Sequence, residues 1–182
     1  MTRIHKEDLF YYNNRAEIAS FVSDNSKVLS NSIESFIENS SEKLIGKQFD
    51  SIRGHLMIYL EAYKRLSEIS NLLANNMKAV NNKMLAYMGS YSEIDNSKIA
   101  EIERRVASIE SLMNSMDLKN RTTNESEYYQ KVLALMNQQK EKLLQLEPLD
   151  RELFDSFVPL MTDIRNLKAS VNGIKTINAD FK

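Results

Sequence analysis

The stretch over residues 49–91 decides the fold: FDSIRGHLMIYLEAYKRLSEISNLLANNMKAVNNKMLAYMGSY. Read at alternating steps of three and four, it forms one seam in which only Ser70 is neither apolar nor aromatic: Phe49, Ile52, Leu56, Tyr59, Tyr63, Leu66, Ser70, Leu73, Met77, Val80, Met84, Tyr87 and Tyr91. A seam of this period without proline is typical of one continuous α-helix with a narrow apolar face. We therefore expect a central helix at about 47–91, roughly 64 Å long, along which the remaining chain packs.

Length and composition favour one domain built from few, long helices. The chain has 182 residues, with only 4 Gly and 2 Pro to make tight turns. We treat residues 1–182 as one helical domain. The 24 basic residues nearly balance the 25 acidic ones, so the composition does not indicate a nucleic-acid partner or a strongly anionic membrane partner.

A first helix is expected at about 6–40, followed by a turn in the polar run 39–46, so that residues 1–95 form a long antiparallel hairpin. The apolar stripe of this first helix is loose: Ile18, Val22, Leu29, Ile33 and Phe36 or Ile37, interrupted by Asn25 and Ser32. The three adjacent rings Phe10, Tyr11 and Tyr12 cannot all face one partner helix. Either some of them meet a second surface, or the first turn is frayed and exposed.

Three further helices are expected over residues 96–182. Asn96 or Ser97 can cap the first of them, the run 117–126 reads as a loop, and the next helix spans about 125–147. Pro148 should end that helix, because proline cannot continue the backbone ladder. The last helix covers about 150–178, with a kink at Pro159 or a separate turn at 150–157. The predicted class is all-α, an elongated antiparallel helical hairpin or bundle.

The sequence offers poor material for catalysis. It has no Cys and two His far apart, and it lacks phosphate-binding glycine loops, zinc-ligand spacings and the Glu-x-x-His pattern of bundle metal sites. We expect no enzyme, no metal, no cofactor and no small-molecule ligand. The seam tyrosines Tyr59, Tyr63 and Tyr87 carry hydroxyls that need water or a polar partner. Together with Phe10, Tyr11 and Tyr12, they are our candidates for a partner interface.

Leu44-Ile45-Gly46 places an L-x-G at the turn between the two long helices, followed by Phe49-Asp50-Ser51-Ile52-Arg53 and the aromatic heptads. Over about residues 1–118 this arrangement resembles the LXG domain, a relative of the small WXG hairpin proteins. LXG domains form the N-termini of toxins exported by the type VII secretion system of Gram-positive bacteria. In this resemblance Leu44 and Gly46 form the targeting turn. Read from the residues alone, they are a hydrophobic staple and a helix-flanking glycine.

The resemblance implies a secretion-targeting domain that binds small helical WXG-like partners and is presented to the secretion ATPase. The chain would be made in the cytoplasm, exported without a signal peptide, and followed by a C-terminal toxin domain. Membrane contact would come only through the secretion machinery. Tyr91 and Asp95 fit the Y-x-x-x-[DE] export signal of such substrates. Two alternatives remain open: a coiled-coil scaffold or adaptor without a secretion role, and a sensory or membrane-perturbing bundle.

Overall fold

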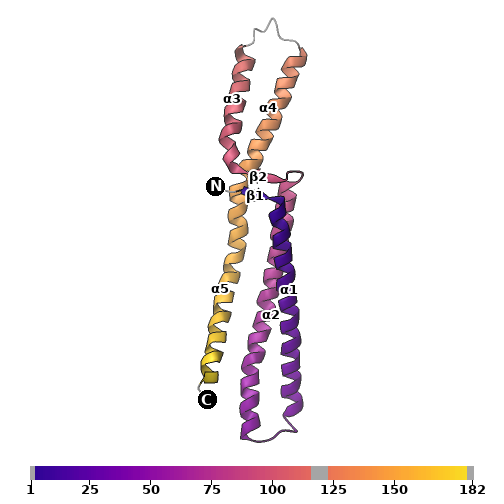
Figure 1. Ribbon diagram of the computed structural model, residues 1–182, viewed down its shortest axis with the longest axis vertical. Coiled ribbons are helices and arrows are strands. Elements are labelled where there is room, and N and C mark those ends of the chain that lie inside the picture. Colours follow the sequence, from indigo (N-terminus) through magenta and orange to yellow (C-terminus); the bar gives the residue numbers. More distant parts are fainter. Residues whose placement is uncertain (1–2, 116–122, 180–182) are drawn as a thin grey trace. The chain divides into compact units, whose positions relative to one another are not determined.

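The computed structural model describes residues 3–115 and 123–179, and nearly all of them are helical (Figure 1). The elements are β1 (Arg3–His5), α1 (Lys6–Ser40), α2 (Lys47–Met88), β2 (Glu93–Asp95), the 3-10 helix η1 (Asn96–Lys98), α3 (Ile99–Ser115), α4 (Thr123–Leu144) and α5 (Leu146–Ala179). The all-α class with long helices is confirmed. The expected central helix is also present, because α2 runs for 42 residues without interruption.

The chain divides into two compact units. The first unit holds Met1–Asp8 and Tyr87–Phe154, and the second unit holds Leu9–Ala86 and Asp155–Lys182. The second unit therefore contains the α1–α2 hairpin and the C-terminal part of α5. The first unit contains the two strands, α3 and α4.

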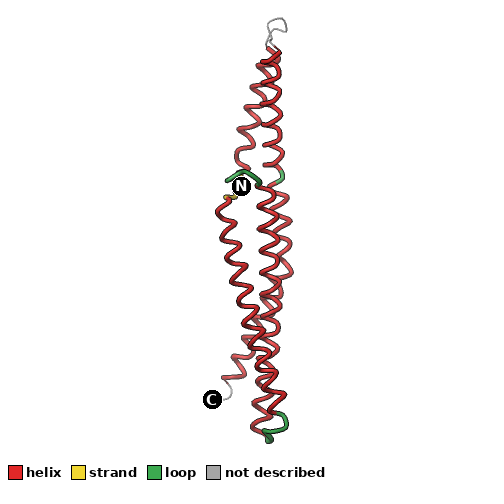
Figure 2. Tube along the Cα trace, turned by 90° about the vertical axis from the view of Figure 1, so that its right-hand side faces the viewer, coloured by secondary structure: helices red, strands yellow, loops and turns green. Residues whose placement is uncertain are grey.

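In the second unit α1 and α2 lie side by side and antiparallel (Figures 1 and 2). Between the buried residues Leu9 and Ser40, the buried positions of α1 are small residues at alternating steps of three and four, namely Ala16, Ala19, Ser23, Ser26 and Ser30. Across the contact, the Ser23 hydroxyl donates to the carbonyl of Ser67 at 2.8 Å. Lys64 forms an ion pair with Glu34 at 2.8 Å. Small side chains let the two backbones approach closely along this face of α1.

The apolar stripe expected for α1 is buried only in part. Ile18, Leu29 and Phe36 are exposed, whereas Val22, Ile33 and Ile37 are half-buried. In α2 the predicted seam does face inward, since every seam residue from Leu56 to Met84 is buried or half-buried. The seam is not covered at its N-terminal end, where Phe49 and Ile52 are exposed.

A small antiparallel sheet in the first unit was not expected from the sequence. Its register pairs Arg3 with Asp95 and Ile4 with Ile94, and the backbone N–H of Lys6 donates to the Ser92 carbonyl at 2.8 Å. Three-residue strands carry too few side chains to show a period, which explains why the sheet is missed. The core of this unit is made by one side chain from each of five elements, α2, β2, α3, α4 and α5: Met88, Ile94, Ile102, Leu143 and Leu146.

Several helix ends differ from the sequence prediction. Helix α2 ends at Met88 and not near Tyr91, because Gly89 adopts a left-handed backbone with φ of 59°. Pro148 lies in the first turn of α5, where its missing N–H costs no helical hydrogen bond. Helix α5 also continues through Pro159, so the separate turn at 150–157 is wrong. Of the predicted loop 117–126, residues 117–122 lie outside the described part of the chain.

Candidate protein-interaction surface

The outward face of α1 in the second unit exposes six large apolar side chains. At 3.6 residues per turn these positions fall on one side of the helix, opposite the Ala and Ser face that meets α2. Their exposed fractions are 72% for Phe10, 60% for Ile18, 69% for Phe21, 63% for Val28, and 46% for both Leu29 and Phe36. We call these six residues the outer stripe. In total they expose on the order of 600 Å², which equals the largest apolar patches of ordinary monomers.

Two polar side chains within the outer stripe, and that of Asn39 just beyond it, are turned back onto their own helix. The Asn25 amide donates to the Phe21 carbonyl at 2.8 Å, and the Ser32 hydroxyl donates to the Val28 carbonyl at 2.9 Å. The Asn39 amide donates to the Ser35 carbonyl at 2.7 Å. Because these donors already have protein acceptors, covering them costs less than covering donors that depend on water. The stripe is therefore suited to burial by a partner despite its polar positions.

The structure divides the six predicted interface aromatics among different environments. Phe10 belongs to the outer stripe, and Tyr11 is exposed beside it, with the Arg15 guanidinium 4.7 Å from its ring centre. Tyr12 is also exposed. Tyr59 and Tyr63 are half-buried in the α2 seam, and Tyr87 is half-buried in the first unit. Of these six predicted aromatics, only the three of α1 thus lie on open surface.

Arg53 organises the turn between α1 and α2. Its guanidinium donates to the Leu44 carbonyl at 2.8 Å and to the Ser40 carbonyl at 3.2 Å. Gly46 has a φ of 130°, a conformation that L side chains rarely adopt. Ile45, between Leu44 and Gly46, is 83% exposed. The hydrogen bonds of Arg53 therefore hold the turn in place, and the side chain of Ile45 is exposed on it.

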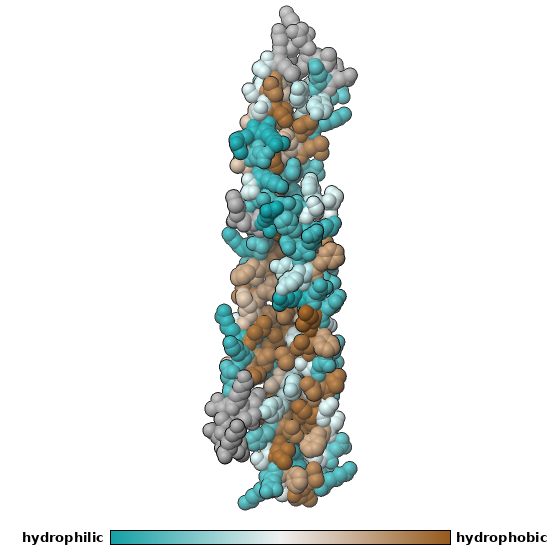
Figure 3. Space-filling view, in the orientation of Figure 1, coloured by the Kyte–Doolittle hydropathy of each residue, from teal (hydrophilic) through white to brown (hydrophobic). Residues whose placement is uncertain are grey.

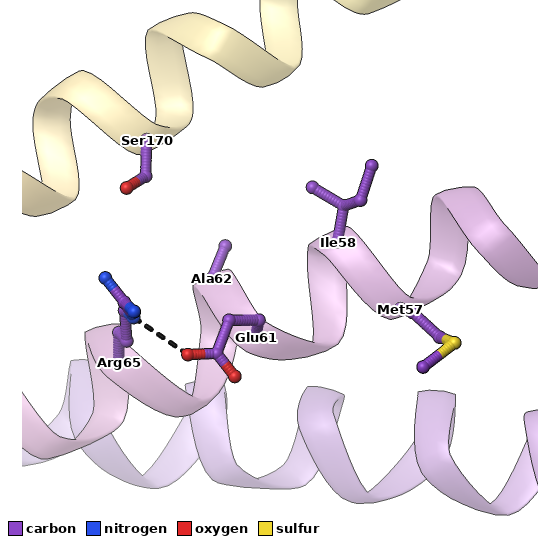
Figure 4. A pocket seen from close by; sticks show the side chains of 6 residues that line it. All are labelled: Met57, Ile58, Glu61, Ala62, Arg65 and Ser170. Carbon is purple, nitrogen blue, oxygen red and sulfur yellow. Dashed lines mark hydrogen bonds and ion pairs between the residues drawn. The ribbon is translucent and has the colours of Figure 1, made fainter.

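An open hollow of about 380 Å³ lies between α2 and α5 in the second unit (Figure 4). It is lined by Met57, Ile58, Glu61, Ala62, Arg65 and Ser170. In the close-up, Ile58 and Ala62 point toward α5, whereas Met57 points away from it. Arg65 donates to Glu61 at 2.8 Å, so the charged side chains at the hollow are paired with each other. The hollow offers an apolar floor and no reactive group.

Apolar side chains also gather over the hairpin on the face drawn in Figure 3. Met57 and Leu72 of α2 are at least half exposed. The hairpin therefore shows apolar surface on α2 as well as on the outer stripe. We take the outer stripe as the principal candidate, because it extends along most of α1 and carries three exposed phenylalanines.

In the first unit, Lys142 ties α4 to the end of α2. Its ammonium group lies 4.7 Å from the Tyr91 ring centre and 5.4 Å from the Tyr87 ring centre, and it donates to the Met88 carbonyl at 3.2 Å. The Tyr87 hydroxyl donates to the Lys142 carbonyl. A cation at this place satisfies a terminal carbonyl of α2 and interacts favourably with the helix dipole. Sequence reasoning missed Lys142, which lies in no motif.

Tyr91 and Asp95, the candidate export motif, lie at one small hollow of the first unit, which Lys98 and Lys142 also line. Tyr91 packs against Lys142, as described above. Asp95 is the N-cap of η1, where its carboxylate accepts from the Ser97 N–H at 2.9 Å. Both residues thus have local structural roles. Whether a secretion system reads them stays a prediction.

Hydrogen bonds and burial perturb three ionisable groups in the first unit. The hydrogen bond from Arg3 lowers the pKa of the Glu93 carboxyl, with further help from Lys98 and His5. The side-chain and backbone hydrogen bonds of Ser97 lower the pKa of Asp95. Burial raises the pKa of the Tyr87 hydroxyl. These shifts follow from the contacts that join the sheet, η1 and the end of α2.

Comparison of the chain with protein-family models, with curated proteins and with solved structures finds no match. Among the described residues, no group of three or more acidic, His or Cys side chains is placed to hold a metal ion. No described helix is both long enough and apolar enough to cross a bilayer. The surfaces of the two units are therefore the features of the described residues that bear on function.

Proposed function

We propose that this chain is a non-enzymatic, secretion-targeting protein-interaction domain of the LXG type. In this proposal it binds small helical WXG-like partners, is presented to the secretion ATPase of a type VII system, and directs the export of a C-terminal toxin. The observation that carries the proposal is the outer stripe of α1. The middle of α1 meets α2 through Ala and Ser, and the six large apolar residues of the outer stripe face solvent, as expected of a surface that a partner covers.

The shape of the stripe supports a helical partner. Its residues extend from Phe10 to Phe36, which is roughly 39 Å along a helix axis. A long, narrow apolar face on one helix is matched best by another amphipathic helix, which inserts its own side chains at steps of three and four. Short hairpin proteins supply such helices.

The turn between α1 and α2 supports the targeting part of the proposal. Arg53 holds the carbonyls of Ser40 and Leu44, and Ile45 is left exposed at the tip. An apolar residue on a fixed turn is a feature that a second protein can recognise. The proposal assigns this role to the turn formed by Leu44 and Gly46.

The test is the export of a reporter fused to the chain in a Gram-positive host with an active type VII system. Leu44→Ala and Gly46→Val should reduce export strongly, and Tyr91→Ala and Asp95→Ala test the second motif. Each variant needs a melting temperature, because Gly46 has a positive φ and Asp95 is an N-cap. Export of the Leu44 and Gly46 variants at the level of the parent would contradict the targeting role and favour a scaffold or adaptor without a secretion role.

A further inference from the structure

The charges beside the outer stripe narrow the class of partner. From Phe10 to Phe36, the positions that face outward within the stripe are uncharged: besides the six apolar residues they hold Tyr11, Asn14, Asn25 and Ser32. The stripe itself therefore selects against a charged partner face, because burying a charge against it would leave that charge unpaired.

One edge of the stripe is acidic. Glu17 lies four residues before Phe21, and Asp24 lies three residues after Phe21 and four before Val28, so both carboxylates neighbour stripe side chains on the helix surface. Both residues are exposed. Glu17 accepts one hydrogen bond, from the Asn13 amide at 3.3 Å. Within the described residues, neither carboxylate has an ion-pair partner.

The opposite edge of the stripe is apolar. Val22 lies on this edge, next to the stripe residues Leu29 and Phe36. The cation on that side is Arg15, whose guanidinium is stacked on Tyr11 and donates to the Tyr11 hydroxyl. A partner helix on the stripe thus lies beside two carboxylates without an ion-pair partner on one edge and beside apolar side chains on the other.

We infer that the outer stripe receives a helix of a different protein, with an uncharged apolar seam and a row of basic residues spaced by seven that pairs with Glu17 and Asp24. This inference rests on the proposed function, since it describes the partner of the same surface. A second copy of this chain is the poorer occupant. In a parallel pair of two copies, Glu17 and Asp24 of one copy would face the apolar edge with Val22 and Leu29 of the other. In an antiparallel pair, the acidic edges of the two copies would face and repel each other.

The probe for the test is a synthetic 28-residue amphipathic helix with a Leu/Ile seam and Lys in both flanking rows, and its control carries Glu in the same rows. Binding to the full chain is measured by fluorescence anisotropy at low and high salt. The Lys probe should bind about tenfold more tightly than the Glu probe, which two exposed ion pairs can supply. The difference should shrink in high salt.

Two variants make the test specific. The double change Glu17→Lys with Asp24→Lys should reverse the preference, so that the Glu probe binds more tightly. Phe21→Asp should remove binding of both probes, because it places a charge in the middle of the stripe. Circular dichroism on each variant shows that the helices are retained.

Three outcomes would overturn the inference. If the two probes bind equally and Phe21→Asp abolishes the binding of both, the partner needs no basic row, although the stripe is still an interaction surface. Sedimentation of the free chain as a dimer that Phe21→Asp converts to a monomer would assign the stripe to a second copy. Binding of both probes unaffected by Phe21→Asp would place the docking site elsewhere. Reporter export tests the proposed function separately from all three.

Discussion

Ser23 of α1 and Ser67 of α2 exchange hydrogen bonds across the hairpin: each hydroxyl donates to the other residue's carbonyl, at 2.8 and 3.0 Å. Such reciprocal contacts require the two backbones to lie close together. The close approach is possible because the face of α1 around Ser23 carries alanine and serine. This contact determines which residues of α1 face inward and which face outward.

Enlarging Ser23 should therefore damage the hairpin. Ser23→Leu forces a large side chain into the close contact and should lower the free energy of unfolding by about 1–3 kcal/mol. Ser32→Leu is the matched control, because it makes the same change on the outward face and should stay within about 0.5 kcal/mol of the parent. Chemical denaturation monitored by circular dichroism measures both. Equal losses in the two variants would contradict the assigned faces.

The sequence predicts the long helices well and the packing of α1 poorly. The seam of α2 is visible because large residues recur at steps of three and four. In α1 the large residues suggest a stripe of which the structure exposes Ile18, Leu29 and Phe36. The inward face has the same period, at Ala16, Ala19, Ser23, Ser26 and Ser30. It escapes notice because small residues give little hydrophobic signal, although their repeat is readable in the sequence.

The candidate site is predicted only in part. Placing Phe10 and Tyr11 at a partner surface fits the open face of α1. The outward positions of Phe21 and Val28 could not be deduced from the sequence, because the side of α1 that meets α2 depends on a contact distant in the chain. Lys142 was missed for the same reason, since 54 residues separate it from the Met88 carbonyl that it caps.

Two glycines should respond in opposite ways to the same substitution. Gly54 lies inside α2 with open space where a Cβ would stand, so Gly54→Ala should stabilise the chain by about 0.5–1 kcal/mol. Gly89 has a φ of 59°, and Gly89→Ala should destabilise the chain by about 1 kcal/mol. Thermal melting should show a higher melting temperature for Gly54→Ala and a lower one for Gly89→Ala than for the parent. Stabilisation by Gly89→Ala would show that the end of α2 does not need the left-handed conformation.

Lys142 should contribute to the stability of the first unit. Lys142→Met keeps most of the side-chain volume but removes the cation from the Tyr87 and Tyr91 rings and from the Met88 carbonyl. We expect a loss of about 1 kcal/mol in the free energy of unfolding. Lys131→Met, at an exposed position of α4, is the control and should have little effect. An indistinguishable result for the two variants would argue against the contact.

Acid should weaken the contact between the strands of the first unit. The Arg3 hydrogen bond lowers the pKa of Glu93 in the folded state. A group with a lowered folded pKa stabilises the fold above its unfolded pKa, and this contribution is lost as the pH falls below about 4.3 toward the folded value. The melting temperature should therefore change less between pH 5 and about pH 3 in the Glu93→Gln variant than in the parent. An identical pH dependence of the two melting temperatures would exclude this role for Glu93.

The central claim is that the large apolar residues of the outer stripe serve a partner and do not hold the free chain together. The most direct measurement is the free energy of unfolding of the isolated Phe21→Ala variant. The exposed position predicts a change within about 0.5 kcal/mol of the parent. A loss of about 3 kcal/mol or more, the usual cost of removing a phenylalanine from a core, would contradict the claim.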